Sequence, residues 1–279
     1  MQPAISRRAF LSSLAVGGAA FTGYSAGVEP NWLNVGRHDV PVPVPGSPVK
    51  ILHLSDFHAS WCVSLHYIQQ AIDLGLSLKP DLICVTGDFI TTTYDDFGGY
   101  QTILSRLASA APTFACMGNH DGGQWSYLHH GYKDNSLVQN LIRQSRMDLL
   151  QNKSTVLDVR GRKVALIGLG DCYALEADPR RAFASPIPAG ALRVVLSHNP
   201  DTKVMLEPYP WDLMLSGHTH GGQLWLPIIG APFAPVEDKR FIAGLYRWSN
   251  RWMHITKGVG NVWGLRFNCR PEVSLLTIT

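Results

Sequence analysis

"VKILHLSDFHASWCVSLHYIQQAIDLGLSLKPDLICVTGD", residues 49–88, contains a complete strand–helix–strand unit. Its two ends, residues 49–56 and 81–88, are short apolar runs that finish in an acidic residue, a pattern typical of strands buried on both faces. Between them, apolar side chains recur at near-helical spacing at Leu65, Ile68, Ile72 and Leu76. Two buried strands joined by a helix favour a right-handed crossover within a parallel sheet.

The same alternation continues along the chain. Helical spacing recurs in the segments 100–107 and 137–142, and strand-like apolar runs occur at residues 111–121, 163–171, 192–200 and 210–220. After about Gln223 the apolar residues alternate, as in "RWMHITKG" (251–258) and "EVSLLTIT" (272–279), which predicts antiparallel strands of a second sheet. The sequence therefore predicts an α/β fold.

The N-terminus resembles an export signal. Arg7 and Arg8 precede a weakly apolar run of small residues that reaches about Ala26, and residues 6–11 match the twin-arginine pattern S-R-R-x-F-L. A short core helix is the alternative. We expect residues 1–27 to engage the twin-arginine (Tat) export machinery, and to be either cleaved or kept as an inner-membrane anchor. The protein would then lie in the periplasm or on the outer face of the cytoplasmic membrane.

Two further divisions follow that segment. Residues 28–48 include "VPVPVPG" and predict an extended linker or an edge strand, because proline cannot donate to a central ladder. Residues 49–279 are then expected to form one catalytic domain.

The charge balance argues against a nucleic-acid partner. The chain of 279 residues carries 24 Lys and Arg against 21 Asp and Glu, and two of the positive charges belong to the predicted export segment. A nearly neutral body lacks the basic surface that binding to phosphate backbones requires. We expect a monomer.

Polar side chains follow five of the predicted strands. Any one of these short motifs could be an ordinary turn, but the carboxyl ends of strands in an open α/β sheet converge on the ligand crevice. The residues in question are Asp56, His58, Asp88, Asn119, His120, Asp121, His198, His218 and His220. Five strand ends that each deliver such residues predict a single polar site at one rim.

The residue types indicate metal ions. Imidazole suits first-row transition metals, and carboxylate and amide oxygens accept harder ions, so the mixture fits Mn, Fe or Zn. Seven candidate ligands are too many for one tetrahedral ion, and they suit two divalent ions that share a bridging carboxylate.

The ordered set D-x-H, G-D, G-N-H-D, H and G-H-x-H resembles that of the calcineurin-like metallophosphoesterases. The resemblance covers about residues 49–279, and "EPNW" (29–32) and "LRFNCRPEVSLL" (265–276) are similar to exported bacterial phosphodiesterases of this family. It implies a four-layer α/β/β/α sandwich with two mixed sheets and two metals at the sheet edge.

The resemblance also implies roles for individual residues. One ion would be held by Asp56, His58, Asp88 and His220. The other would be held by Asp88, Asn119, His198 and His218, with Asp88 bridging the pair. His120 would be the general acid, and Asp121 would orient its ring.

The predicted reaction is the hydrolysis of a phosphodiester, and lipid-linked diesters are among the candidate substrates. Two cations would lower the pKa of a bridging water, and the resulting hydroxide would attack in line with the leaving oxygen. The alternatives are a pyrophosphohydrolase acting on a lipid precursor of the UDP-diacylglucosamine type, a phosphomonoesterase, or a non-catalytic metal-binding module.

Other residues have weaker patterns. Arg266 and Arg270 could bind phosphate or support the last strands through salt bridges. Trp61, Trp125, Trp225 and Trp263 fall near the predicted rim, and we expect ordinary core packing for them, with contact to an apolar or lipid-like part of the substrate as the alternative. His129 and His130 are expected to be a solvated pair. The remaining histidines, His38, His53, His66 and His254, are expected to be structural.

Overall fold

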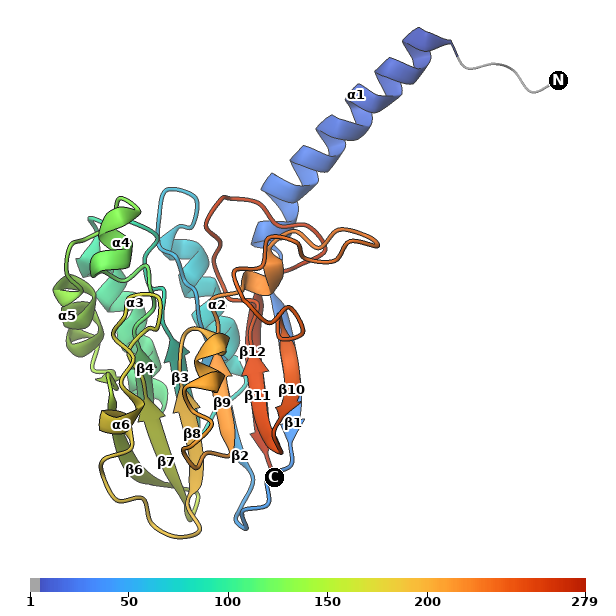
Figure 1. Ribbon diagram of the computed structural model, residues 1–279. Helices are drawn as coiled ribbons and strands as arrows, with labels where there is room; N and C mark the ends of the chain where they lie inside the picture. Colours follow the sequence, from blue (N-terminus) through green and yellow to red (C-terminus); the bar gives the residue numbers. More distant parts are fainter. Residues whose placement is uncertain (1–5) are drawn as a thin grey trace.

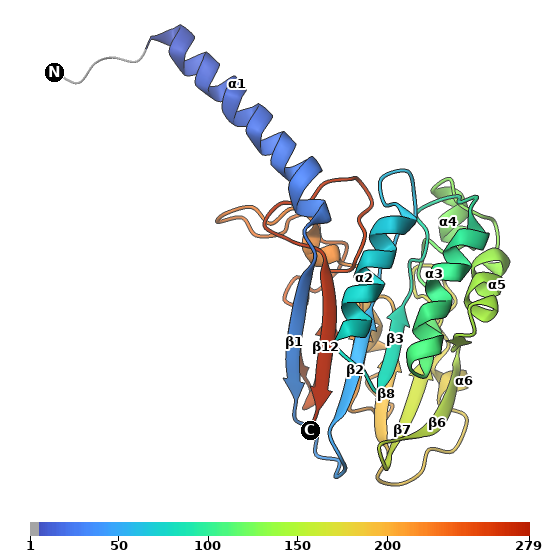
Figure 2. The same cartoon turned by 180° about the vertical axis from the view of Figure 1, so that it is seen from behind.

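Two six-stranded sheets pack face to face in the computed structural model, which describes residues 6–279 (Figures 1 and 2). The first sheet has the order β1-β12-β2-β3-β4-β5, with bounds Asn34–Val40, Glu272–Ile278, Val49–Leu54, Leu82–Thr86, Thr113–Cys116 and Asp148–Leu149. The second has the order β10-β11-β9-β8-β7-β6, with bounds Gly244–Trp248, Arg251–Ile255, Leu213–Ser216, Leu192–Leu196, Arg162–Gly168 and Lys153–Val159. Both sheets are mixed, as predicted.

Helices cover the outer face of the first sheet (Figure 2). They are α2 (Leu65–Ser77), α3 (Phe97–Ala110) and α5 (Ser136–Gln144), whereas the short α4 (Gln124–Leu128) lies in the segment between β4 and α5 and places no apolar residue in this core. The side chains of Ser64 and Asp96 cap α2 and α3 by accepting backbone N–H groups of Tyr67 and Gly99, which satisfies donors that have no partner inside the helix. The apolar faces of these helices then pack on the sheet.

The layer between the sheets follows the period of two that strands impose. Alternate residues of β2, Val49 and Ile51, point into it, as do Leu213 and Leu215 of β9. This apolar layer fixes the two sheets against each other, and with them the loops that extend from both.

The fourth layer is thin. The outer face of the second sheet carries the short α6 (Pro179–Ala182) and the 3-10 helix η3 (Pro200–Val204), with Trp211 and Phe241 completing the packing. The predicted four-layer sandwich is therefore present, with its helices concentrated on one side.

The C-terminal strands follow the prediction in part, since β10 and β11 pair antiparallel in the second sheet. β12 joins the first sheet, where it runs antiparallel to β2 and parallel to β1, and β11 pairs parallel with β9. Alternation shows which residues of a strand are buried, but it does not identify the strand's neighbours. The segment 28–48 supplies β1, which lies at one edge of the first sheet and ends where the proline-rich stretch begins.

The predicted export segment forms α1 (Arg7–Gly23), which projects from the body and has no buried residue (Figure 1). The first five residues of that segment lie outside the described residues. Phe21 stacks at 4.8 Å on Phe267, and Glu29 accepts the backbone N–H of Asn268 at 3.0 Å, so the base of α1 is tied to the 264–269 loop. Within residues 6–279, no helix combines the length and the apolar character that a membrane crossing demands.

Candidate metal centre

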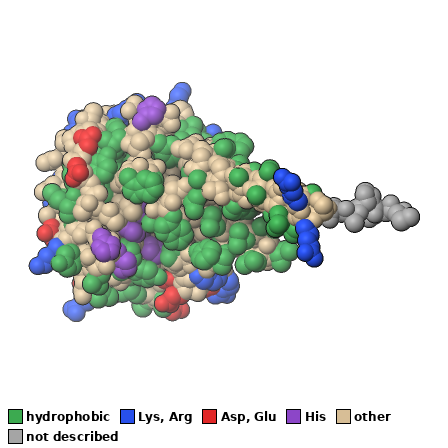
Figure 3. All heavy atoms as spheres, turned by 90° about the horizontal axis from the view of Figure 1, so that it is seen from above, with side chains coloured by type: hydrophobic (Ala, Val, Ile, Leu, Met, Phe, Trp, Pro, Cys, Tyr) green, Lys and Arg blue, Asp and Glu red, His purple; other side chains and the backbone are tan. Residues whose placement is uncertain are grey.

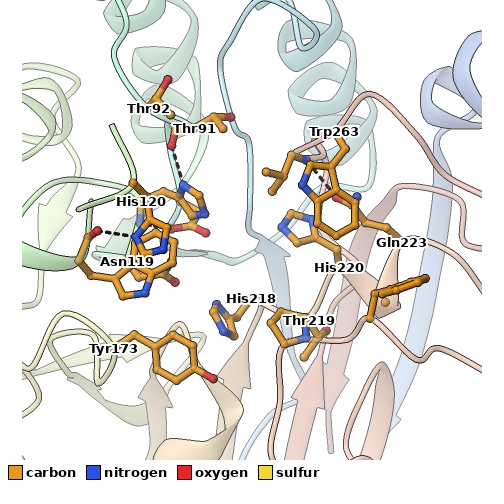
Figure 4. Close-up of a pocket in the computed structure, with 17 residues that line it drawn as sticks. Thr91, Thr92, Asn119, His120, Tyr173, His218, Thr219, His220, Gln223 and Trp263 are labelled. Carbon is orange, nitrogen blue, oxygen red and sulfur yellow. Dashed lines mark hydrogen bonds between the residues drawn. The ribbon is translucent and has the colours of Figure 1, made fainter. Parts of the chain in front are cut away.

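Seven predicted ligands meet at one rim of the sandwich. They are carried by the loops that follow β2, β3, β4, β8 and β9, and none is more than 5% exposed. Several of these residues point into one cavity, as Figure 4 shows for Asn119, His218 and His220.

The backbone at this rim is strained. Left-handed φ values, which cost non-glycine residues free energy, occur at Asp56 (53°), His58 (50°), Asp88 (55°), His218 (69°) and His220 (51°). Such conformations persist only where the surrounding structure enforces them, and they concentrate at functional sites. Position 118 requires glycine for a different reason, because a Cβ there would overlap the Asp88 carboxylate.

The first group of ligands consists of Asp56, His58, Asp88 and His220, whose ligand atoms all lie within 4.8 Å of one another. His58 Nε2 lies 3.1 Å from His220 Nε2 and 3.3 Å from Asp88 Oδ2. His220 Nε2 lies 3.5 Å from Asp56 Oδ1. His58 Nε2 thus faces two ligand atoms at once, and one shared proton cannot bond to both of them. A cation bound by all of these atoms would satisfy them together.

The second group consists of Asp88, His198 and His218. His198 Nε2 lies 3.0 Å from Asp88 Oδ2 and 3.2 Å from His218 Nδ1. Asn119 lines the same pocket, and its buried Oδ1 has no hydrogen-bond partner among the described residues. Asp88 belongs to both groups, which is the arrangement expected of a bridging carboxylate.

The charge states also fit metal ions. Burial lowers the pKa of His58, of His220 and of His218, the last to about 3, so these imidazoles keep the lone pairs that metals require. Burial acts to raise the pKa of Asp88, but the nearby His198 holds it well below its usual range. The buried donor set therefore fits two divalent cations.

Neighbouring groups orient the ligands. The Nδ1–H of His198 donates to the Thr86 carbonyl at 2.7 Å, which leaves Nε2 free to coordinate. The backbone N–H of His218 donates to Asp56 Oδ1 at 3.0 Å, so the second sheet's loop is held on the first sheet's carboxylate.

His120 lies at the pocket with its ring fixed by a residue that sequence analysis missed. Its Nδ1–H donates to the Thr91 carbonyl at 2.5 Å (Figure 4). Its ring also meets that of Trp125 edge-on, with 4.7 Å between the ring centroids. The predicted orienting role of Asp121 is wrong. Its buried carboxylate accepts backbone N–H groups of Asp88 at 2.9 Å, Phe89 at 2.6 Å and Gly118 at 2.8 Å, and so shapes the loops that hold the metals.

The pocket over the metal centre has a volume of about 380 Å³ and a largely apolar wall. Besides the polar residues, its lining includes Trp125, Phe233, Pro235, Val262 and Trp263. Tyr173 packs edge-on against His218 at 4.8 Å and also lines the pocket, and the sequence analysis did not predict it. Because Tyr173 follows β7, the search for polar residues after strand ends could have identified it.

The predicted core packing of the tryptophans is wrong. Trp61, Trp225 and Trp263 are 90%, 43% and 55% exposed, and Trp125 lies in the pocket wall. The paired histidines are exposed as expected, and His129 in addition stacks on Trp125 at 3.8 Å and lines the pocket.

The two arginines donate to backbone carbonyls, and neither makes a salt bridge with an acidic side chain of the described residues. Arg266 is fully buried, and its guanidinium donates to the carbonyls of Cys269 at 2.9 Å and Lys257 at 2.7 Å. Arg270 donates to the carbonyls of Trp32 and Leu33. Both arginines brace backbone that contains no regular strand or helix to satisfy its carbonyls.

Several known proteins are similar to this chain in sequence. A model described as calcineurin-like phosphoesterase matches residues 49–222. "Phosphodiesterase YaeI" of Escherichia coli (strain K12) is 42% identical over 98% of this chain and 99% of its own length. The uncharacterized metallophosphoesterase YkuE of Bacillus subtilis (strain 168) is 28% identical over 98% of both chains. The UDP-2,3-diacylglucosamine pyrophosphatase LpxG of Chlamydia muridarum is 27% identical over 89% of this chain and 90% of its own.

Proposed function

Since the chain belongs to the calcineurin-like phosphoesterase family, we propose that this metal-dependent phosphoester hydrolase cleaves phosphodiesters that carry an apolar group. The observation that supports the reaction most directly is the division of the buried ligands into two groups around Asp88. The 42% identity to a phosphodiesterase supports a diester over a monoester or a pyrophosphate.

The chain's own residues position the reactants. The two ligand groups would hold two divalent cations, which when bound supply an activated water and positive charge for the phosphoryl oxygens. His120 turns its Nε2 toward the pocket because Nδ1 is held by Thr91. From there a protonated Nε2 would donate to the leaving oxygen, which is a poor leaving group unless it is protonated.

The apolar pocket wall supports the choice of substrate. A phosphodiester headgroup at the metals would place its organic substituents against Trp263, Phe233 and Trp125. The face seen in Figure 3 has hydrophobic side chains around the histidines and along α1. A lipid-linked diester would match both the polar centre and this apolar rim.

A comparison of model substrates tests the reaction. Protein reconstituted with Mn, Fe or Zn should hydrolyse bis(p-nitrophenyl) phosphate faster than p-nitrophenyl phosphate, with the Asp88→Asn variant as the inactive control. Faster cleavage of the monoester would overturn the diesterase assignment. A panel that includes phospholipids and a UDP-linked pyrophosphate would separate a lipid diesterase from a pyrophosphohydrolase.

We further propose that the protein is exported by the Tat pathway and acts in the periplasm or at the outer face of the cytoplasmic membrane. The twin arginines Arg7 and Arg8 support this, as does the exposed apolar surface of α1. Because Tat moves folded proteins, the metals would be acquired in the cytoplasm, which favours Mn or Fe. Fractionation of cells that express an Arg7→Lys, Arg8→Lys double variant should show loss of export, and unchanged export would refute the Tat route.

A further inference from the structure

A second histidine cluster lies between the two sheets and shares no residue with the two ligand groups at the rim. It occupies the inward positions of three strands: His38 on β1, His254 on β11 and Glu272 on β12. The neighbouring inward positions of these strands hold apolar side chains such as Val40, Trp252 and Leu276. Polar groups buried in such a layer need partners, because desolvation without them is costly.

Two of these groups have no partner among the described residues. The buried Nε2 atoms of His38 and His254 make no hydrogen bond, although His254 is fully buried. The ligand atoms of His38, His254 and Glu272 nevertheless all lie within 4.8 Å of one another. His254 Nε2 is 3.9 Å from Glu272 Oε1, which is too long for a hydrogen bond but leaves space for an ion between them.

The contact that His254 makes through Nδ1 decides whether its Nε2 carries a proton or a free lone pair. Its Nδ1 lies 2.9 Å from Nδ1 of His53, and His53 Nε2 lies 2.8 Å from the Thr86 hydroxyl. When His254 Nδ1–H donates to His53, the bare lone pair on Nε2 faces a carboxylate oxygen with no proton between them. That arrangement is repulsive unless a cation occupies the gap. In the opposite tautomer, Nε2–H is a buried donor without an acceptor.

The backbone leaves room at this point. A Cβ on Gly36 would lie 2.8 Å from Glu272 Oε1 and 3.2 Å from His38 Nε2, so a larger residue would press on both groups. Ser274 donates its hydroxyl to Glu272 Oε1 at 2.6 Å and orients the carboxylate. Lys257 Nζ lies 3.9 Å from the other oxygen, Oε2, and leaves Oε1 facing the histidines. His38 is only half-buried, which gives a route from solvent.

We propose that His38, His254 and Glu272 form a third cation site, separate from the rim, that takes a zinc-class divalent ion. Two imidazoles and one carboxylate form a ligand set that such ions accept, with a water as the fourth ligand. The ion would join β1 and β12 of the first sheet to β11 of the second. Through His53 it would also steady Thr86, whose carbonyl orients His198 at the metal centre.

Zinc stoichiometry of the full chain tests this site independently of activity. Protein equilibrated with zinc should bind about three ions, the Asp88→Asn variant about one, and the Asp88→Asn, His38→Gln double variant none. Arg37→Gln, at an exposed position of the same strand, is the matched control and should leave the count unchanged. The proposal fails if Asp88→Asn binds no zinc, or if the added His38→Gln leaves that last ion in place.

A second measurement guards against misfolding of the double variant. In the Asp88→Asn background, zinc should raise the thermal unfolding midpoint, because a ligand that binds the native state stabilises it. Gly36→Ala, which leaves all three ligands in the chain, should reduce that shift. A midpoint that does not respond to zinc, or an equal shift with Gly36→Ala, would contradict the proposal.

Discussion

The two sheets make different contributions to the metal centre. The first sheet supplies both carboxylates, one imidazole ligand, the amide and the candidate acid, through Asp56, Asp88, His58, Asn119 and His120. The second sheet supplies only imidazoles, at His198, His218 and His220. Each ligand group nevertheless draws on both sheets, so neither half of the sandwich can bind an ion with its full ligand set.

This division shows where the charge of the site resides. The negative charge that attracts cations is carried by one sheet, and it is packed against imidazoles from the other, of which burial keeps His218 and His220 neutral by lowering their pKa. The apolar layer between the sheets keeps the two sets in register. Substitution of Asp88, the first-sheet ligand that both groups share, should therefore affect both ions, whereas substitution of a second-sheet ligand should affect one ion at a time.

The strongest test of this division is Asp88→Asn. The change removes the shared charge while keeping the size of the side chain, so both ions should be lost. Because the ions contribute several kcal/mol to the transition state, activity should fall by about 10³-fold or more. Elemental analysis and diester hydrolysis measure the two effects. An active variant that keeps both ions would remove the bridging role.

His120→Gln tests a first-sheet residue that holds no ion. Metal content should be unchanged, because neither ligand group includes His120. Alkyl diesters, whose leaving oxygens need a proton, should slow by about 10²–10⁴-fold, and nitrophenyl diesters should slow much less. Rates on the two substrate types measure the difference. Equal losses would argue against an acid role.

His218→Asn tests the second sheet. His218 belongs to one ligand group, and asparagine keeps an oxygen donor, so one ion should weaken and the other should stay. We expect activity to fall by about 10²-fold and to recover partly at higher metal concentration. Metal titration followed by hydrolysis measures this. Loss of both ions together would show that the sheets do not divide the work as the geometry suggests.

Much of the site could be predicted because its residues follow strands directly. Asp56, Asp88 and His198 each lie just beyond an apolar run, and parallel strands bring such ends together whatever the sequence distance. The role of Asp121 could not be predicted, because its backbone partners at residues 88 and 89 come close only once β3 and β4 pair. The sheet to which β12 belongs was predicted wrongly for a related reason. The alternation of apolar and polar residues along a strand is the same whichever sheet the strand joins.

The smallest expected effect concerns the pocket wall, where neither sheet supplies a ligand. Trp263 lines the pocket but belongs to no ligand group, so Trp263→Ala should leave both ions and the rate on small nitrophenyl diesters unchanged. For a long-chain phosphodiester the lost apolar contact should raise KM by about 10-fold, as expected when a large aromatic contact is removed. Trp61→Ala, at a 90% exposed tryptophan that does not line this pocket, is the matched control. If both variants behave alike, the wall does not select apolar substrates, and the metal centre alone sets specificity.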